Sequence, residues 1–391
     1  MLGRIKSMGR RIKLIVQNPL DIKMIKFDRK CCKDGIVLVT HESNNLGASI
    51  LLKHIASELV DQGYNVYIIS RQFGVLNKEY SKIAPTQIVM TNKSFALTLS
   101  KLRKYGYSRL LFNTVVCGDL VKIAKDEGYK VVSLIHELAK VVKMLSCEKN
   151  TEEMIKYSDR TVFSTNVAKK EVLDLLGIHD NSSILIKPQG LYYKTPSEKI
   201  INGEIDRLKN KYPIDNYDGV VIGVGNTTER KGFDLFVETA AQLPDILFFW
   251  AGKKESYYDT VLKQNDNKLP DNFIFLGVLN SQELAGLYSV ASVLLMSSRK
   301  DTLPSIIFES LLFTVPVIGS MDSGGIVDII NENNGILTDS ATSKQFADAV
   351  RIVLKSETMI KLKSWIKNNQ SKCVYSFSDY VSFIVSLYSQ I

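Results

Sequence analysis

Short, continuously apolar runs alternate with segments of helical periodicity along most of this chain, and this alternation constrains the fold more than any other feature. A run without polar alternation suits a strand that is buried on both faces of a sheet. Strands that alternate with helices predict a parallel sheet covered by helices on both sides. In the first half the predicted strands are 35–40, 65–70, 109–113, 130–136, 160–164 and 183–186.

The alternation breaks in the middle of the chain, from Lys187 through a charged helical segment to Tyr217, and then restarts. The later predicted strands are 219–223, 247–251, 273–276, 293–296 and 315–318. Because 391 residues exceed one ordinary domain, we predict an α/β protein with two Rossmann-like, doubly wound domains. Its expected parts are a leader at 1–34, a first domain at 35–193, a linker at 194–216, a second domain at 217–372 and a C-terminal helix at 373–391.

The net charge of +9 is concentrated at the amino terminus. Residues 1–33 hold ten Lys or Arg against two Asp, a net +8, which leaves +1 for residues 34–391. The body therefore offers no general basic surface for nucleic acid. Residues 1–16 follow amphipathic helical spacing, so residues 1–30 are a candidate contact with an anionic membrane. An organelle transit peptide and an ordinary surface helix are the alternatives.

No segment predicts a membrane span, since the stretch 302–321, which is otherwise uncharged, contains Glu309 and two prolines. The absence of a C-x-x-C pair favours reduced thiols over disulfides or a zinc site. We therefore expect a cytoplasmic protein, peripheral on the cytoplasmic face of the membrane. The five cysteines are Cys31, Cys32, Cys117, Cys147 and Cys373.

The segment D-T-L-P-S-I-I-F-E, from Asp301 to Glu309, reads as the start of an apolar helix. Pro304 suits the first helical position, which would leave the next three backbone N–H groups, through Ile307, as free donors for a phosphate. Glu309 lies one turn beyond Ser305 on the same face, where it could accept hydrogen bonds from a ribose diol. Taken singly, Asp301 also fits a helix cap, and Glu309 also fits a solvated stripe.

Arg230 and Lys231 lie in the segment 226–232, N-T-T-E-R-K-G, between a predicted strand and a helix. Loops at this end of a doubly wound sheet bind ligands. The two cations could hold a pyrophosphate and stabilise its charge as it leaves, or they could be solvated surface charges. Gly223 and Gly225 begin a dinucleotide fingerprint, but the G-x-G-x-x-G spacing fails, so NAD is not expected.

Two loops of the first half are weaker candidates. The loop N-N-L-G, from Asn44 to Gly47, follows the first predicted strand, and its glycine would let the backbone approach a ligand. It also fits an ordinary turn. His136 and Glu137 end a predicted strand, where a histidine is either a site residue or a neighbour of a helix cap.

In combination these segments resemble the family 4 glycosyltransferases of bacterial polysaccharide biosynthesis, which are retaining enzymes with the GT-B fold, two Rossmann-like domains facing across a cleft. The resemblance covers most of residues 35–391. The segments H-E-S-N-N-L-G-A and S-L-I-H-E-L are similar to its amino-terminal motifs. The family's later motifs are similar to the segments G-x-G-x4-R-K-G-F-D-L-F (223–236), F-W-A-G (249–252), F-L-G-V-L (275–279), S-R-K-D-T-L-P-S-I-I-F-E-S (298–310) and V-P-V-I-G-S-M-D-S-G-G (315–325).

The resemblance implies that the first domain binds the acceptor and the second the nucleotide-sugar donor. Arg230 and Lys231 would bind the donor diphosphate, Glu309 the ribose hydroxyls and Asp301 the hydroxyls of the transferred sugar. His136 would face that sugar, and the C-terminal helix would cross back to the first domain. The remaining donor-binding positions would be Gly47, Gly225, Gly277, Leu303, Pro304, Ser305 and Ile306.

The chain departs from the family at Asp301, where the family usually has a longer glutamate. No D-x-D motif occurs, so the resemblance implies no metal and no cofactor beyond the nucleotide-sugar co-substrate. The implied reaction moves a sugar to a hydroxyl acceptor with retention, in cell-surface polysaccharide or lipid-linked glycan assembly. The alternatives are a GT-B-like nucleotide-sugar epimerase or hydrolase and a non-catalytic, membrane-associated assembly subunit.

Overall fold

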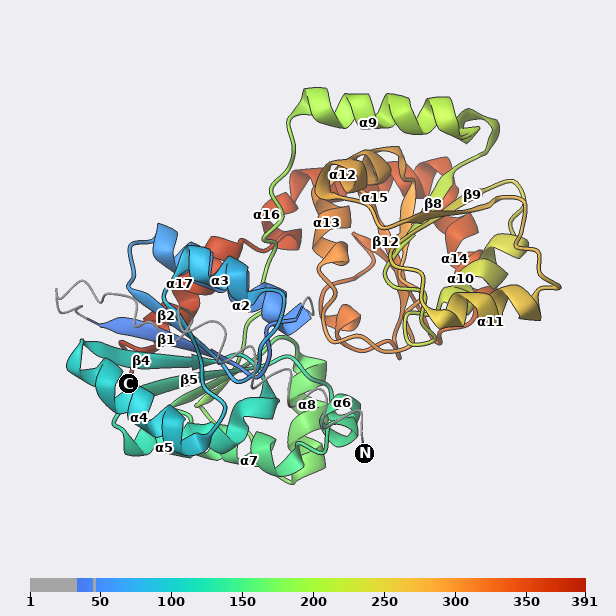
Figure 1. Cartoon of the computed structure of the whole chain (residues 1–391). Coiled ribbons are helices and arrows are strands. Elements are labelled where there is room, and N and C mark those ends of the chain that lie inside the picture. The colour runs from blue at the N-terminus through green and yellow to red at the C-terminus, as the bar shows by residue number, and fades with distance from the viewer. Residues whose placement is uncertain (1–33, 45–46) are drawn as a thin grey trace, which may run out of the picture. The chain divides into compact units, whose positions relative to one another are not determined.

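The computed structural model describes residues 34–44 and 47–391, which divide into two compact α/β units (Figure 1). The first unit contains the described residues up to Val162 together with 180–185 and 381–391. The second unit contains 163–179, which include α8 (Asn166–Leu176), and 186–380. The predicted leader, apart from Asp34, lies outside the described residues, as do Cys31, Cys32 and the loop positions 45–46.

The sheet of the first unit has seven strands in the order β3-β2-β1-β4-β5-β6-β7. The central strand β1 pairs in parallel with β2 and β4, and every residue of β1 is buried. This burial explains its uninterrupted apolar sequence. The strands are β1 (Gly35–Thr40), β2 (Val66–Ser70), β3 (Thr86–Ile88), β4 (Tyr107–Phe112), β5 (Lys130–Ile135), β6 (Arg160–Phe163) and β7 (Ile184–Ile186).

Helices cover both faces of this sheet (Figure 1). One layer contains α2 (Gly47–Asp61), α3 (Asn77–Ile83) and α17 (Phe377–Leu387). The other layer contains α4 (Asn92–Lys104), α5 (Val121–Asp126) and α7 (Glu148–Tyr157). Shorter elements follow β4 and β5, namely the 3-10 helix η1 (Val115–Leu120) and α6 (Ala139–Met144).

The last residues of the chain pack into the first unit. The hydroxyl group of Tyr388, whose side chain is buried, donates a hydrogen bond to the carbonyl of Leu110 at 2.8 Å. The Lys130 ammonium donates to the Tyr388 carbonyl at 3.0 Å, and the Arg109 guanidinium lies over the Tyr388 ring. These contacts join the end of α17 to β4 and β5.

The sheet of the second unit is parallel, with the order β10-β9-β8-β11-β12-β13. Its strands are β8 (Val220–Val224), β9 (Leu247–Ala251), β10 (Phe273–Gly277), β11 (Val293–Leu295), β12 (Val317–Ser320) and β13 (Gly335–Thr338). Its helices are α9 (Glu198–Lys211), α10 (Phe233–Ala241), α11 (Ser256–Gln264), α12 (Ser281–Val290), α13 (Ile306–Leu312), α14 (Ser343–Leu354), α15 (Ser356–Asn368) and α16 (Gln370–Cys373), with the 3-10 helices η2 (Ile214–Asn216) and η3 (Gly325–Asp328).

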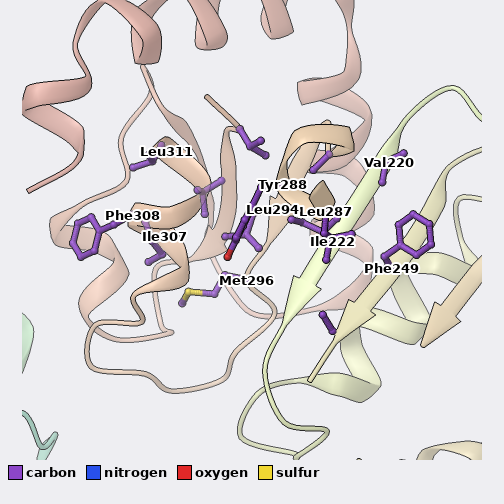
Figure 2. Close-up of a cluster of buried hydrophobic side chains, with 14 of the residues drawn as sticks. Val220, Ile222, Phe249, Leu287, Tyr288, Leu294, Met296, Ile307, Phe308 and Leu311 are labelled. Carbon is purple, nitrogen blue, oxygen red and sulfur yellow. The ribbon is translucent and has the colours of Figure 1, made fainter. Parts of the chain in front are cut away.

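One hydrophobic cluster of this unit joins the sheet to α12 and α13. Figure 2 shows Tyr288 of α12 among the side chains of β11 and α13, including Leu294 and Ile307. On α9, within the expected linker, Arg207 pairs with Glu283 of α12. A Cβ atom at Gly286 would lie 2.4 Å from that of Glu204, so α9 packs closely on α12. A second cluster packs α10 and α14 on the sheet.

All the strands predicted from apolar runs are present, and the predicted GT-B architecture of two parallel-sheet units is confirmed by solved structures reported below. The edge strands β3 and β13 were not predicted, because both are short and only partly buried. Cys117, Cys147 and Cys373 are buried free thiols. No helix in the described ranges has the length and apolar composition needed to cross a bilayer.

Candidate functional site

The loops that follow β8 and β11 run against each other at the carboxyl edge of the second sheet. Gly232 adopts a φ of 66°, and a Cβ atom there would lie 2.0 Å from the Ser297 carbonyl oxygen. Only glycine permits this approach. The Ser297 hydroxyl donates to the Lys231 carbonyl at 3.1 Å, and the Arg299 N–H donates to the Arg230 carbonyl at 2.9 Å. The backbone that carries Arg230 and Lys231 is therefore fixed.

Arg299 and Asp234 fasten the same two loops, a pair that the sequence analysis did not identify. The guanidinium donates to both carboxylate oxygens of Asp234, at 2.7 and 2.6 Å, and also to the Glu229 carbonyl at 2.8 Å. Hydrogen bonding to Asp234 raises the pKa of Arg299. Opposite charges in the motifs R-K-G-F-D and S-R-K-D were the available signal, but opposite charges alone do not specify a partner.

Asp301 and the two predicted phosphate-binding cations converge. The Lys231 ammonium donates to Oδ2 of Asp301, and the Arg230 guanidinium lies 3.3 Å from the same oxygen. The Asp301 and Lys231 side chains are 15% and 17% exposed, whereas that of Arg230 is 56% exposed. Burial acts to raise the pKa of Asp301, but the two cations outweigh it and hold the pKa below its ordinary value. Two cations around one carboxylate leave an excess positive charge.

The loop after β12 fixes the backbone of Asp301. The Asp301 N–H donates to the Ser323 carbonyl at 2.7 Å, and the Gly325 N–H donates to the Asp301 carbonyl at 3.0 Å. Gly324 has a φ of 106°, and a Cβ atom there would lie 2.2 Å from the Asp301 carbonyl oxygen. The residue at the N-cap of α13 is Ser305. The alternative that Asp301 merely caps that helix is therefore wrong.

Gly225 lies beneath the predicted phosphate-binding lysine. A Cβ atom at Gly225 would lie 3.4 Å from Cδ of Lys231, so the aliphatic stem of Lys231 passes over this glycine. The Trp250 indole donates to the Gly225 carbonyl at 2.8 Å and fixes the turn. Gly277, with a φ of 78°, ends β10 beside open space.

The start of α13 differs from the prediction. The helix begins at Ile306, and Pro304 precedes the N-cap residue Ser305 instead of occupying the first helical position. The Ile307 N–H donates to the Pro304 carbonyl at 3.2 Å, so the prediction that Ile307 offers a free donor is wrong. The backbone tightens into an i to i+3 turn, a common way to satisfy a terminal donor. Leu303 and Pro304 are buried, whereas Ser305 and Ile306 are half-buried.

Glu309 is a buried carboxylate of the second unit that two hydroxyl groups contact. Its Oε1 accepts from the Ser305 hydroxyl at 3.2 Å, as one helical turn of separation predicts, and its Oε2 accepts from the Tyr288 hydroxyl at 3.1 Å. Glu309 is 9% exposed, so the alternative of a solvated stripe is wrong. Burial raises the pKa of Glu309 despite these two hydrogen bonds. Sequence periodicity predicts only a core role for Tyr288, so its hydroxyl contact was missed.

His136 and Gly47 belong to the first unit, whereas the other predicted site residues belong to the second. The Nε2 atom of His136 is buried without a hydrogen-bond partner in the described part of the chain. Burial lowers the pKa of His136 to about 4, which keeps the ring neutral at physiological pH. Glu137 accepts hydrogen bonds from the Thr114 hydroxyl at 2.8 Å and from the His136 N–H at 2.9 Å. Gly47 begins α2 at an exposed position, with open space where a Cβ atom would lie.

The part of the chain that holds the paired loops matches a known family: residues 204–372 match Glycosyl transferases group 1. A curated relative, alpha-galactosylglucosyldiacylglycerol synthase of Streptococcus pneumoniae (strain ATCC BAA-255 / R6), is 27% identical over 135 residues, or 32% of this chain and 34% of the relative. This chain thus spans about a third of that relative's length. N-acetyl-alpha-D-glucosaminyl L-malate synthase of Bacillus anthracis is 20% identical over 339 residues, or 80% of this chain and 86% of the relative.

Solved structures show the same fold. Anabaena Alr3699/HepE in complex with UDP has a TM-score of 0.78 and 15% sequence identity, covering 91% of this chain and 100% of that chain. The same protein in complex with UDP-glucose has a TM-score of 0.74 and 15% identity, with the same coverage. These structures confirm the GT-B arrangement of two parallel-sheet units predicted from the sequence.

The partly buried His136, whose Nε2 atom is fully enclosed, makes stability depend on pH. An exposed His136 in the unfolded chain protonates near pH 6.5, whereas the folded chain keeps it neutral down to about pH 4. Between these values the unfolded state binds more protons, so the free energy of unfolding falls as pH falls. From neutral pH to about pH 5 we expect the free energy of unfolding to fall by an amount on the order of 2 kcal/mol. The variant His136→Asn should not show this fall, because asparagine does not titrate. Urea unfolding at both pH values measures it, and an equal pH dependence in the two proteins would contradict the burial of a neutral ring.

The Arg299 guanidinium is expected to stabilise the paired loops beyond its charge. Arg299→Lys keeps the charge but loses the two-pronged contact with Asp234, so the free energy of unfolding should fall by about 1 kcal/mol. Arg351→Lys is the matched control, because Arg351 pairs with Asp348 on an exposed surface. Urea unfolding of both variants measures the difference. Equal urea midpoints for the two variants would show that the two hydrogen bonds from Arg299 to Asp234 add nothing to the free energy of unfolding.

Proposed function

We propose that this protein is a glycosyltransferase that moves a sugar from a nucleoside-diphosphate sugar to a hydroxyl acceptor in glycolipid or polysaccharide assembly. The observation that carries this proposal is the group of Lys231, Arg230 and Asp301, which holds excess positive charge on fixed loops at the ligand-binding edge of a parallel sheet. These loops lie within the matched region 204–372. The relatives add support, since one is a glycolipid synthase and the Anabaena structures contain UDP and UDP-glucose.

The cations would act on the leaving group. A lysine ammonium has three donors, so Lys231 can keep its bond to Asp301 and offer the other two to phosphate oxygens. Arg230, which is more exposed, adds a second positive charge. As the bond to the anomeric carbon breaks, negative charge grows on the departing diphosphate, and fixed cations stabilise it without reorganisation. We propose that these side chains take the place of a metal, because the chain lacks a D-x-D motif.

The remaining residues would position the donor and the sugar. We propose that Glu309 accepts hydrogen bonds from the ribose hydroxyls, since a carboxylate has lone pairs left after contacts with Ser305 and Tyr288. Asp301 would contact the transferred sugar, and neutral His136 would face it from the first unit. Retention would follow if the acceptor attacks from the face that the diphosphate leaves, with a phosphate oxygen taking the acceptor proton. Backbone groups from Leu303 to Ile306 and the glycines Gly47, Gly225 and Gly277 would line the donor site.

The leading test combines a donor screen with an acceptor requirement. UDP-, GDP-, ADP- and dTDP-sugars are each tested for thermal stabilisation, and nucleotide release is then followed with and without a glycolipid extract as acceptor. A transferase releases nucleotide much faster with acceptor present, and treatment with EDTA leaves the rate unchanged. Stabilisation by none of these donors would contradict the donor site. Equal release without acceptor would favour the alternative of an epimerase or hydrolase, and binding without release would favour a non-catalytic subunit.

Lys231 should contribute to nucleotide binding more than to folding. We expect Lys231→Ala to weaken the affinity for the nucleoside diphosphate by about ten-fold to a hundred-fold, as expected for loss of a charge-assisted contact. Lys268→Ala, which removes an exposed lysine of the same unit, serves as the control. Calorimetric titration of both variants measures the affinities, and thermal melting checks the fold. Unchanged affinity in Lys231→Ala would refute the assignment.

Glu309 should recognise the ribose hydroxyls specifically. Glu309→Gln is expected to weaken the affinity for the nucleoside diphosphate by about ten-fold. The affinity for its 2′,3′-dideoxy analogue should stay unchanged. Because burial raises the pKa of Glu309, wild-type affinity should also fall as pH is lowered through that raised pKa, and the variant should lack this step. Titration with both ligands over a pH series measures these effects. Equal losses of affinity for the two ligands would contradict the proposal that Glu309 binds the ribose hydroxyls.

We also propose that the basic leader brings the protein to the cytoplasmic face of an anionic membrane. Residues 1–33 hold a net +8, and each basic residue near such a surface contributes about 1 kcal/mol. Deletion of residues 2–16 should therefore reduce co-sedimentation with anionic liposomes. Co-sedimentation with neutral liposomes should stay unchanged. No loss of binding would refute this anchor.

A further inference from the structure

One face of helix α4 in the first unit is apolar and buried. Phe95, Leu99 and Leu102 are at most 1% exposed and follow one another at spacings of four and three residues. This is the stripe of an amphipathic helix packed on its unit. In Figure 1, α4 lies with α5 and α7 in one of the two helix layers that cover the sheet.

The opposite side of α4 carries an apolar residue that the fold does not explain. Leu97 is 56% exposed and lies between Lys93 and Lys101, four residues away on each side, and Lys104 continues the same stripe. Met90, just before the helix, is 47% exposed. We call Met90, Lys93, Leu97, Lys101 and Lys104 the α4 face.

The positive charge of the α4 face has no ion-pair partner in the part of the chain that the structure describes. The sequence of α4, N-K-S-F-A-L-T-L-S-K-L-R-K, contains no acidic residue. None of its three exposed lysines forms an ion pair with a residue in the described ranges, whereas Lys53, Lys122 and other lysines of the first unit pair with carboxylates. Positive charge that pairs with no carboxylate of the described residues, next to exposed apolar side chains, suits an anionic and apolar partner.

We propose that the α4 face binds the surface of an anionic phospholipid bilayer. Leu97 and Met90 enter the boundary between headgroups and acyl chains, and the lysines contact lipid phosphates, as on a helix that lies in the plane of an interface. A nucleic acid would use the lysines but would gain nothing from the exposed Leu97. This proposal depends neither on the donor site nor on the leader.

The test uses the full chain and vesicles of two compositions. One is pure phosphatidylcholine, and the other is an equimolar mixture with phosphatidylglycerol. The α4 variant carries Lys93→Glu, Lys101→Glu and Lys104→Glu, and its partition coefficient on the anionic vesicles should fall at least about ten-fold. All three positions are exposed, and circular dichroism checks the fold.

A charge-matched control separates the α4 face from the leader and from net charge. The control variant carries Lys344→Glu, Lys361→Glu and Lys367→Glu, at exposed positions of the second unit. Its partition coefficient should stay within about two-fold of the wild-type value, because the α4 face and not these three lysines contacts the membrane. Equal losses in the α4 and control variants would overturn the proposal.

Leu97 distinguishes insertion from adsorption by charge alone. Leu97→Ser should weaken partition several-fold, and Leu97→Trp should give a blue-shifted emission on anionic vesicles after subtraction of the wild-type signal. On phosphatidylcholine vesicles no shift is expected. A Leu97→Trp emission that stays unshifted on saturating anionic vesicles, or full binding by Leu97→Ser, would overturn the proposal.

Discussion

The ion pair between Lys231 and Asp301 is the contact on which the candidate site depends. A partly buried carboxylate is costly unless it is paired, and a partly buried lysine is costly for the same reason. Each partner therefore needs the other, and the loops must hold both in position. The close approach of Gly232 to Ser297, the Arg299–Asp234 fork and the turn at Gly324 provide this support through backbone and side-chain contacts. The geometry is thus set before any ligand arrives.

The two carboxylates of the candidate site, Asp301 and Glu309, differ in charge environment and therefore in their proposed roles. Asp301 stays ionised because Lys231 and Arg230 surround it, so it keeps the cations together while leaving them a net positive charge. No cation pairs with Glu309 among residues 34–44 and 47–391, and burial raises its pKa. It is held instead by the hydroxyls of Tyr288 and Ser305, neutral partners that leave it able to accept further hydrogen bonds. In the proposed function, Asp301 holds the cations that stabilise the diphosphate and contacts the transferred sugar, whereas Glu309 recognises the ribose.

Much of the fold was predictable because strands buried on both faces leave continuous apolar runs. The edge strands β3 and β13 lack that burial and therefore that signal. The predicted strand at 315–318 begins two residues later, at Val317, beyond a proline that has no N–H to pair. Within the site, helical spacing placed Glu309 beside Ser305. It could not identify Tyr288 or Arg299 as partners, because those contacts join distant segments, and it misjudged Ile307, whose N–H bonds to Pro304 in a tight turn.

A crystal structure of the protein with a bound nucleoside diphosphate would test the central claim most directly. The account predicts diphosphate oxygens within hydrogen-bond distance of the Lys231 ammonium, with Lys231 still bonded to Asp301 and the ribose hydroxyls on Glu309. A nucleotide bound with its phosphates away from both Lys231 and Arg230 would contradict it.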